Sequence, residues 1–179
     1  MWAVDLLQIH GLLQIPQYVA ALLEPLGLDG PEGKGERLQQ IVQIRTIRQR
    51  RLLAPASLGV DMVVGQAAVE TAIGSPAVMH AQVTHLLQIS RQPNVTLRLL
   101  PFSAGATPAH SGSFAVLGFE VPELAEAVYL EGLAGQLLLD KPAEVDRYRK
   151  SYATTAERAL MPEESREYLD VVQKRWAAA

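Results

Sequence analysis

The chain has 179 residues, of which 49% are hydrophobic and 20% charged, so it fits a single domain, residues 1–179, long enough to bury a core. It contains no cysteine, which excludes disulfides, thiolate zinc sites and cysteine nucleophiles, and its net charge of −3 argues against direct nucleic-acid binding. No apolar run approaches about 18 residues and the N-terminus lacks a basic segment, so we expect no membrane span, no signal peptide and a cytoplasmic location.

The first third of the chain predicts two helices. Residues 5–24 indicate a turn-rich segment around His10 and Gly11, followed by a helix that begins at Pro16, because proline fits the first turn of a helix. His10 and Tyr18 either line a pocket there or belong to a turn that docks on the core. A glycine-rich loop at residues 27–36 connects to the next helix.

The second helix, residues 36–53, is amphipathic and rich in arginine, and Pro55 ends it. Its spacing leaves open whether Ile44 or Arg45, and Ile47 or Arg48, lies on the buried stripe. The arginines either form a solvated face or contact an acidic partner or nucleic acid.

The middle of the chain predicts a strand at residues 59–65 and helices at 66–73 and 77–90, the last with Ser75 as its N-cap and Pro76 at its first position. Strands follow at residues 95–100 and 114–119, which we expect to pair with each other. Residues 127–131 and 135–140 predict a hairpin. Helices within 142–160 and at 163–176 complete an α+β fold: N-terminal helices, a mostly antiparallel or mixed sheet of about five strands, and C-terminal helices.

The loop between the strands at 95–100 and 114–119, PFSAGATPAHSGS, is the best ligand-binding candidate. It offers an aromatic wall in Phe102, hydroxyls including Ser103 and Ser113, and one titratable group, His110. The alternative is an ordered loop that only turns the chain.

Two carboxylates end the strands of the expected hairpin. We expect Glu131 and Asp140 at one rim of the sheet, either for acid–base work or as acceptors of backbone hydrogen bonds, with Arg48 as an ion-pair partner of one of them. His80 and His85 are five residues apart, which does not suit a metal site, and no nucleophile, phosphate-loop or dinucleotide motif is present. We therefore expect neither metal nor cofactor and assign no catalytic residue.

Six segments together resemble one family: HGLLQIPQYVAALL, RTIRQRRLL, IGSPAVMHAQVTHLL, QPNVTLRLLPFSAGATPAHSGSFAVLGF, VYLEGLAGQLLLD and ALMPEES. The family is the C-terminal domain of unknown function that follows a helix-turn-helix in actinobacterial transcription regulators, including Xre-type, WhiJ-like and antitoxin-like members. The helix-turn-helix is absent from this chain, and GQAAVETAIG, with Gln66, Glu70 and Thr71, departs from the family pattern.

The resemblance implies a regulatory domain associated with transcription regulation that senses a small molecule or interacts with a small partner protein, and it carries no catalytic residues. Whether the chain forms a homodimer is left open. The alternative function is a free-standing enzyme of natural-product biosynthesis (secondary metabolism), of cyclase or isomerase type. His110, Glu131 or Arg48 would assist its reaction.

Overall fold

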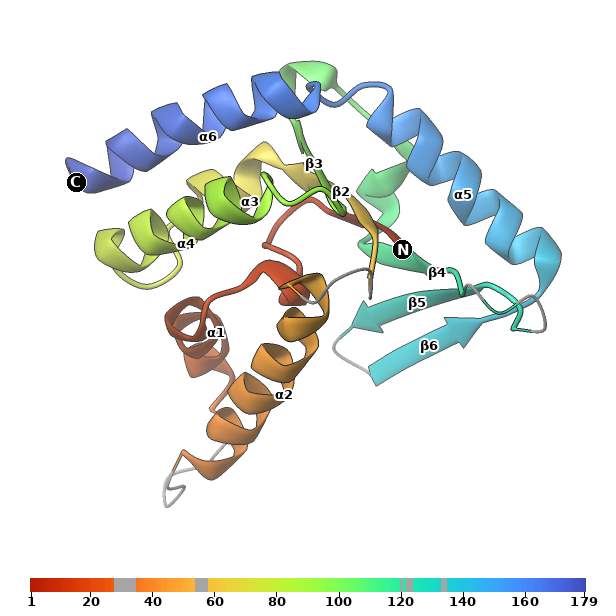
Figure 1. The fold of residues 1–179 in the computed structure, drawn as a ribbon, viewed down its shortest axis with the longest axis horizontal. Helices are drawn as coiled ribbons and strands as arrows, with labels where there is room; N and C mark the ends of the chain where they lie inside the picture. The colour runs from red at the N-terminus through yellow and green to blue at the C-terminus, as the bar shows by residue number, and fades with distance from the viewer. Residues whose placement is uncertain (28–34, 54–57, 120, 122–123, 133–134) are drawn as a thin grey trace.

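The computed structural model describes residues 1–27, 35–53, 58–119, 121, 124–132 and 135–179 (Figure 1). Its strands are β1 (Trp2–Asp5), β2 (Val60–Gly65), β3 (Val95–Leu100), β4 (Phe114–Leu117), β5 (Ala127–Gly132) and β6 (Gly135–Leu139). Its helices are α1 (Pro16–Leu23), α2 (Glu36–Leu53), α3 (Gln66–Glu70), α4 (Pro76–Ile89), α5 (Pro142–Ala156) and α6 (Pro162–Ala177). Residues 28–34 of the expected loop at 27–36, and the helix end at Pro55, lie outside the described residues.

All six strands form one mixed sheet in the order β3-β2-β1-β4-β5-β6. β1, β2 and β3 are parallel, whereas β1, β4, β5 and β6 pair antiparallel in that order. The helices between the parallel strands make the long crossovers that parallel pairing requires. The α+β class and the β5–β6 hairpin are thus confirmed, with six strands where the sequence indicated about five.

The additional strand, β1, lies at the centre of the sheet. Its four residues pair with β2 on one side, and the first three of them pair with β4 on the other. The sequence did not indicate it because WAVD is too short to show an alternating pattern and has one β-branched residue. Its conformation depends on two neighbours that are distant in the chain.

The expected pairing of the strands at 95–100 and 114–119 is wrong. β3 is an outer strand that pairs with β2, and both β2 and β1 separate it from β4. α4 returns the chain to the edge next to β2, so the loop at 101–113 crosses the end of the sheet instead of closing a hairpin. α3 also ends at Glu70, earlier than the expected residue 73.

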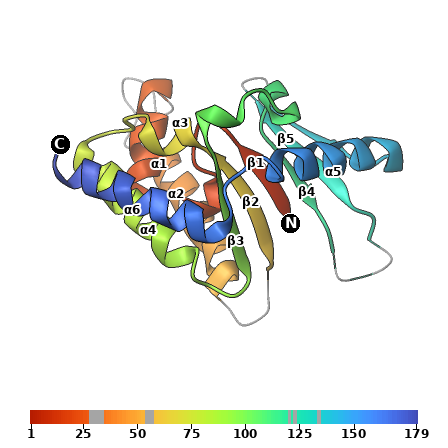
Figure 2. The ribbon, with the colours of Figure 1, turned by 90° about the horizontal axis from the view of Figure 1, so that it is seen from above.

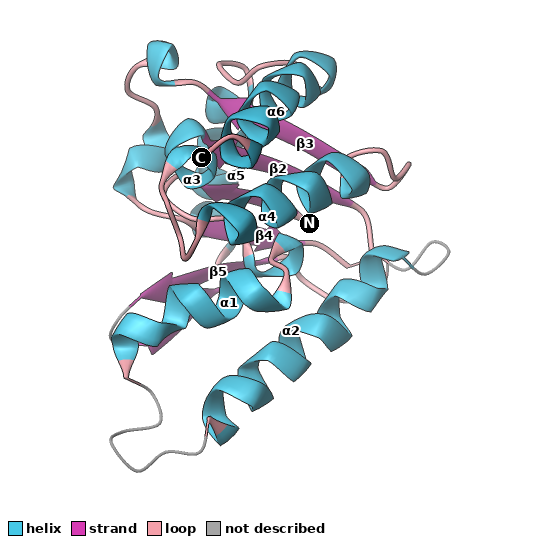
Figure 3. Cartoon of the chain, turned by 90° about the vertical axis from the view of Figure 1, so that its left-hand side faces the viewer, coloured by secondary structure: helices cyan, strands magenta, loops and turns pink. Residues whose placement is uncertain are grey.

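Helices cover the two faces of the sheet unequally, as Figures 2 and 3 show. α1, α2, α3, α4 and α6 lie on one side, and α5 lies on the other. The larger core joins α4 and α6 to alternate residues of β2 and β3, such as Met62, Val64 and Leu97. The smaller core sets Val145 and Tyr152 of α5 against residues of β1, β2, β4 and β5. Because successive side chains of a strand point to opposite faces of the sheet, every second residue faces the side of α2 and the residues between them face the side of α5.

α2 turns polar side chains inward. Arg45 donates to the side chain of Gln14, and Gln49 donates to the carbonyl of the same residue. Ile44 and Ile47 are 49% and 61% exposed. The buried stripe thus takes Arg45 in place of Ile44, because the short segment before α1 supplies hydrogen-bond acceptors for it.

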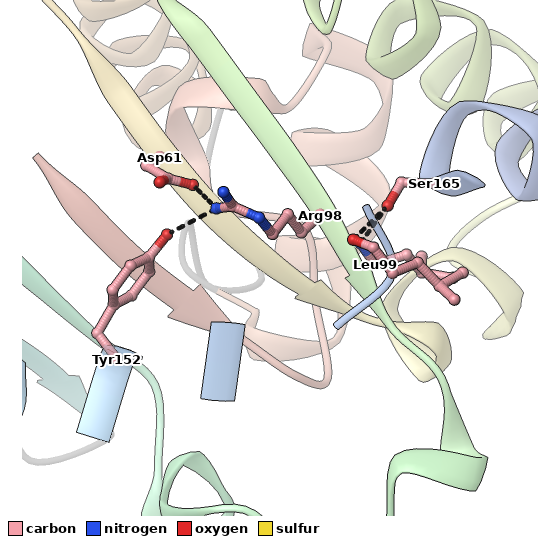
Figure 4. A network of polar contacts seen from close by, with 6 residues as sticks. Asp61, Arg98, Leu99, Tyr152 and Ser165 are labelled. Atoms are coloured by element: carbon pink, nitrogen blue, oxygen red, sulfur yellow. Dashed lines mark hydrogen bonds and ion pairs between the residues drawn. The ribbon is translucent and has the colours of Figure 1, made fainter. Parts of the chain in front are cut away.

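Two polar contacts fasten the C-terminal helices to β3 (Figure 4). Arg98 forms an ion pair with Asp61 of β2 and donates to the hydroxyl of Tyr152 in α5 at 3.5 Å. Ser165 of α6 accepts a hydrogen bond from the amide of Leu99 at 2.9 Å. Consecutive residues of β3 therefore hold helices on opposite faces of the sheet.

Helix starts follow the sequence signals. The Ser75 hydroxyl accepts a hydrogen bond from the Val78 amide, with Pro76 in the first turn, and Pro162 opens α6 with acids in its first turn. Among the described residues, no helix has the length and apolar character needed to cross a membrane.

Candidate functional site

Side chains of opposite charge gather at the end of the sheet where β1 and β5 finish. Val4 pairs with Phe114, and Ala115 pairs with Tyr129. Continuing these registers places Asp5, Ser113 and Glu131 in one row across β1, the residue before β4, and β5. Figure 1 shows the arrowhead of β5 directed toward α2. Ala3, Ala115 and Tyr129, each two residues from a member of the row, belong to or pack against the larger core, so the row lies on the α2 side of the sheet.

Asp5 is the buried member of this row. Its side chain is 7% exposed, and burial raises the pKa of its carboxyl group to about 7, while a hydrogen bond from Ser113 lowers the pKa and the charge of Glu131 raises it. A carboxyl group with this pKa exchanges its proton near neutral pH. The position can therefore change charge under physiological conditions.

Arg45 brings a positive charge to the same place from α2. Its guanidinium group lies over Gly11, with 3.8 Å between the Arg45 carbon Cζ and the position of a Cβ on that glycine. Burial lowers the pKa of Arg45, and the charge of Glu131 opposes that shift. Because a guanidinium stays protonated in proteins, Arg45 remains a cation near Glu131.

Tyr18 and His10 form the inner wall. The Tyr18 hydroxyl accepts a hydrogen bond from the Ile9 amide at 3.3 Å, and His10 accepts one from the Leu12 amide through Nδ1 at 3.1 Å. Burial, followed by the charge of Arg45, lowers the pKa of His10 to about 4. His10 is therefore neutral at pH 7, and its turn docks on the core through the buried side chain of Leu13.

Arg48 and Glu131 form the exposed rim of the cluster. Both influence Tyr129, whose pKa is raised first by burial and then by Glu131, with Arg48 and Arg45 opposing. Within the described part of the chain, neither Arg48 nor Glu131 makes a hydrogen bond or ion pair. The expected ion pair of Arg48 with Glu131 or Asp140 is therefore not formed among the described residues. We call Asp5, Tyr18, Arg45, Arg48, Tyr129 and Glu131 the Asp5 cluster.

The expected placement of Glu131 and Asp140 at one rim is wrong. Val128 pairs with Leu139 and Glu131 pairs with Gln136. Because the two strands of a hairpin run in opposite directions, the last residue of β5 lies beside the first residues of β6, and Asp140 lies at the other end. The two carboxylates cannot act as a pair.

The rest of the central loop is an ordered structure with its own contacts. The Phe102 amide donates to the Gln66 side chain at 2.8 Å, and the ring is 65% exposed. His110 and Thr107 cap one 3-10 turn, and Ser103 is exposed on the other. Of the loop candidates, only Ser113 lies beside the Asp5 cluster.

The segment GQAAVETAIG also has structural contacts. Gln66 holds the loop through Phe102, while Glu70 accepts a hydrogen bond from Tyr168 and forms an ion pair with Arg175 at 3.3 Å. These contacts dock α3 on α6.

Away from the Asp5 cluster, a surface hollow lies between α4 and α6, next to Arg91 and Arg166. Within the part of the chain that the structure describes, no group of three or more His, Asp or Glu side chains is placed to hold a metal ion. The cluster is thus built from charges and phenols, with Asp5 and Tyr18 buried and Arg48 and Glu131 exposed.

Sequence reasoning found Ser113, Glu131 and Arg48 but missed Asp5, Arg45 and Tyr129. A charged residue directly after an apolar strand was the available signal for Asp5, and it needed the assignment of β1. Arg45 was visible as an alternative to Ile44 on the buried stripe. Tyr129 showed only as one apolar residue of an expected strand.

The fold and the site define an α+β domain with a mixed-charge cluster at one end of its central sheet. The particular family follows from the sequence: the profile described as "Domain of unknown function (DUF5753)" matches residues 1–170, and the chain belongs to that family. Searches of curated proteins and of solved structures gave no match.

Proposed function

We propose that this chain is a regulatory domain that binds a small molecule at the Asp5 cluster and thereby controls a transcription regulator of the actinobacterial helix-turn-helix type. The observation that carries the proposal is the convergence of carboxylates and guanidinium groups from β1, α2 and β5, in which Arg48 and Glu131 form no hydrogen bond or ion pair with the described residues. A cytoplasmic location and binding without a cofactor belong to the same proposal.

The energetics of Asp5 support a binding role. Burial of an ionisable carboxyl group without a close cation costs stability, and such groups concentrate at functional sites. The side chain lies beside Ser113 and Glu131, and no ion pair to Asp5 is formed within the described residues. A bound cation or hydrogen-bond donor would remove this cost, so ligand binding would stabilise the domain.

The arrangement of charges favours an amphoteric ligand. An acidic group would contact the guanidinium of Arg48, while an amine or hydroxyl would contact the carboxylate of Glu131. Both charges act on Tyr129, a partly buried residue that packs against the larger core and offers an apolar ring. Small molecules that carry both groups a few bonds apart fit this pattern.

The experiment is a thermal-denaturation screen with the twenty free amino acids as amphoteric probes, and with glutarate and putrescine as probes of single charge sign. We expect at least one amphoteric probe to raise Tm, and the rise to be lost in Glu131→Gln and Arg48→Gln. Glu157→Gln and Arg147→Gln, at exposed positions on or directly after α5, are the matched controls and should keep the rise. No rise with any probe, or an equal rise in the site variants, contradicts the proposal.

A second candidate function is a small enzyme of natural-product biosynthesis, of cyclase or isomerase type. It is favoured by the near-neutral pKa of Asp5, which suits a general acid or base. Mass spectrometry of the bound probe after incubation separates the two functions, because a sensor returns its ligand unchanged. Conversion that is lost in Asp5→Asn would establish the enzyme.

A further inference from the structure

β6 is the outer strand of the sheet at the edge opposite β3. It pairs with β5 along its whole length, in a continuous register from Gly132–Gly135 to Val128–Leu139. No other strand of the described residues lies on its free side. The backbone groups on that side are therefore available to a further strand.

β6 lacks the features that usually protect a sheet edge. Its sequence, Gly-Gln-Leu-Leu-Leu, contains no proline and no charge, and its register shows no bulge. Leu137 and Leu138 are 53% and 60% exposed. An uncharged edge with exposed leucines favours association.

The exposed leucines extend both faces of the sheet. Leu138 lies beside Tyr129, which packs against the larger core, and Leu137 lies beside Leu130, which packs against the smaller one. A strand added to β6 would continue both apolar rows, which a helix on one face would not do. The edge therefore fits a strand as its partner.

We propose that β6 pairs antiparallel with β6 of a second copy of this chain, with Leu138 opposite Leu138 across the two-fold axis. A two-fold axis sets a strand against itself, so any charge at its centre would meet a like charge, and β6 has none. The result is a continuous sheet that spans two protomers.

The polar residues select this register. With Leu138 on the axis, Leu137 lies opposite Leu139 of the second copy, and Gln136 lies opposite Asp140. The Gln136 oxygen accepts from the Tyr129 hydroxyl at 3.1 Å, which leaves its amide N–H groups to donate to that carboxylate. Asp140 makes no hydrogen bond or ion pair with the residues that the structure describes.

Neighbouring registers lose this complementarity. An axis at Leu137 would place Gln136 opposite Leu138, and an axis at Leu139 would place Leu138 opposite Asp140. Either shift would bury a polar group against a leucine without a partner, which costs free energy.

The test is sedimentation equilibrium of the full chain between about 1 and 100 µM, the range in which dimers of moderate affinity dissociate. We expect a monomer–dimer equilibrium, and in Leu138→Lys a dissociation constant raised about tenfold or more, because two ammonium groups would meet at the axis. Val171→Lys, a matched change at an exposed position of α6, should leave the constant unchanged.

The register can be tested separately by disulfide cross-linking, because the chain contains no cysteine and each introduced cysteine is therefore the sole thiol. Residues opposite each other across an antiparallel pair have Cα atoms about 4.5 to 5.5 Å apart, within the range for a disulfide. Mild oxidation should therefore cross-link Leu138→Cys into a covalent dimer much faster than Leu137→Cys or Val171→Cys. A wild-type chain that stays monomeric, a dimer that Leu138→Lys does not weaken, or equal cross-linking of the three cysteine variants would overturn the proposal.

Discussion

The side chain of Ser113, one residue before β4, lies beside the carboxyl group of Asp5 at the end of β1 and lowers the pKa of that carboxyl group. This contact joins the end of the central loop to the first strand of the sheet. The loop thus contributes to the Asp5 cluster at its last residue, where the backbone already follows the β1–β4 register. The remainder of the loop supports the fold.

The first prediction concerns Asp5→Asn and the pH dependence of stability. The pKa of Asp5 is raised from 3.8 to about 7 in the folded state, so the folded protein holds this proton more tightly than the unfolded chain. The resulting stability is fully present below pH 3.8 and is lost as the pH rises toward 7. The free energy of unfolding of the variant, relative to wild type, should therefore rise between pH 4 and 8 by about 4 kcal/mol at most.

Urea unfolding at pH 4, 6 and 8 measures this difference. Asp146→Asn is the matched control, because its carboxylate lies on the exposed side of α5. If the Asp5→Asn difference stays constant with pH, the carboxyl group titrates alike in the folded and unfolded states and the prediction is wrong.

The second prediction concerns His10→Asn, for which the change of stability with pH has the opposite sign to that of Asp5→Asn. The pKa of His10 is lowered from 6.5 to about 4 by burial and by Arg45, so the unfolded chain takes up this proton first as the pH falls. The stability due to neutral His10 is fully present above pH 6.5 and is lost toward pH 4. His10→Asn should gain stability relative to wild type over that interval, by about 3 kcal/mol at most.

Asparagine keeps a side-chain acceptor for the Leu12 amide, so the turn is preserved. The same urea titrations serve both variants, and the slopes of the two differences against pH should have opposite signs. Equal slopes for Asp5→Asn and His10→Asn would show that a general pH effect, unrelated to either side chain, governs the measurement.

The sequence predicted most of the fold because its signals are local. Pro16, Ser75-Pro76 and Pro162 mark helix starts by backbone geometry and capping, and β-branched residues mark β2 and β3. It could not predict the order of the strands, since β1 and β4 acquire their partners from distant parts of the chain.

The candidate site was predicted only in part for the same reason. Glu131 and Ser113 are visible as polar residues that flank strands, but their meeting with Asp5 depends on two registers that no local pattern encodes. The error over Asp140 arose from the geometry of hairpins, in which consecutive strand ends lie at opposite rims. Predicting the role of Arg45 would have required knowing which side of α2 faces the hydrogen-bond acceptors of Gln14.

The third prediction concerns the ion pair between Arg98 and Asp61. Both side chains are less than one-third exposed, and Arg98 also donates to Tyr152 of α5. Arg98→Met would keep much of the packing but leave the carboxylate and the hydroxyl without this donor, so we expect a loss of about 1 to 2 kcal/mol in the free energy of unfolding. Arg147→Met, the same change at an exposed position of α5, is the control in urea unfolding. An equal loss in both variants contradicts the prediction.

The last prediction tests how closely β1 and β2 approach next to Asp5. A Cβ atom on Gly65 would lie 2.7 Å from the Leu6 Cα and still closer to the Leu6 carbonyl oxygen, so the backbone after Asp5 would have to move. The φ angle of Gly65 is −70°, which any residue adopts, so the cost is steric and not conformational. Gly65→Ala should lose about 2 to 3 kcal/mol in the free energy of unfolding.

The control is Gly59→Ala, just before the other end of β2, where an added Cβ meets nothing within 4 Å and should change stability little. Because the displaced residue follows Asp5 directly, Gly65→Ala should also reduce the dependence of stability on pH that Asp5 causes. A variant that unfolds like Gly59→Ala would show that β1 and β2 separate more easily than their contact at Leu6 implies.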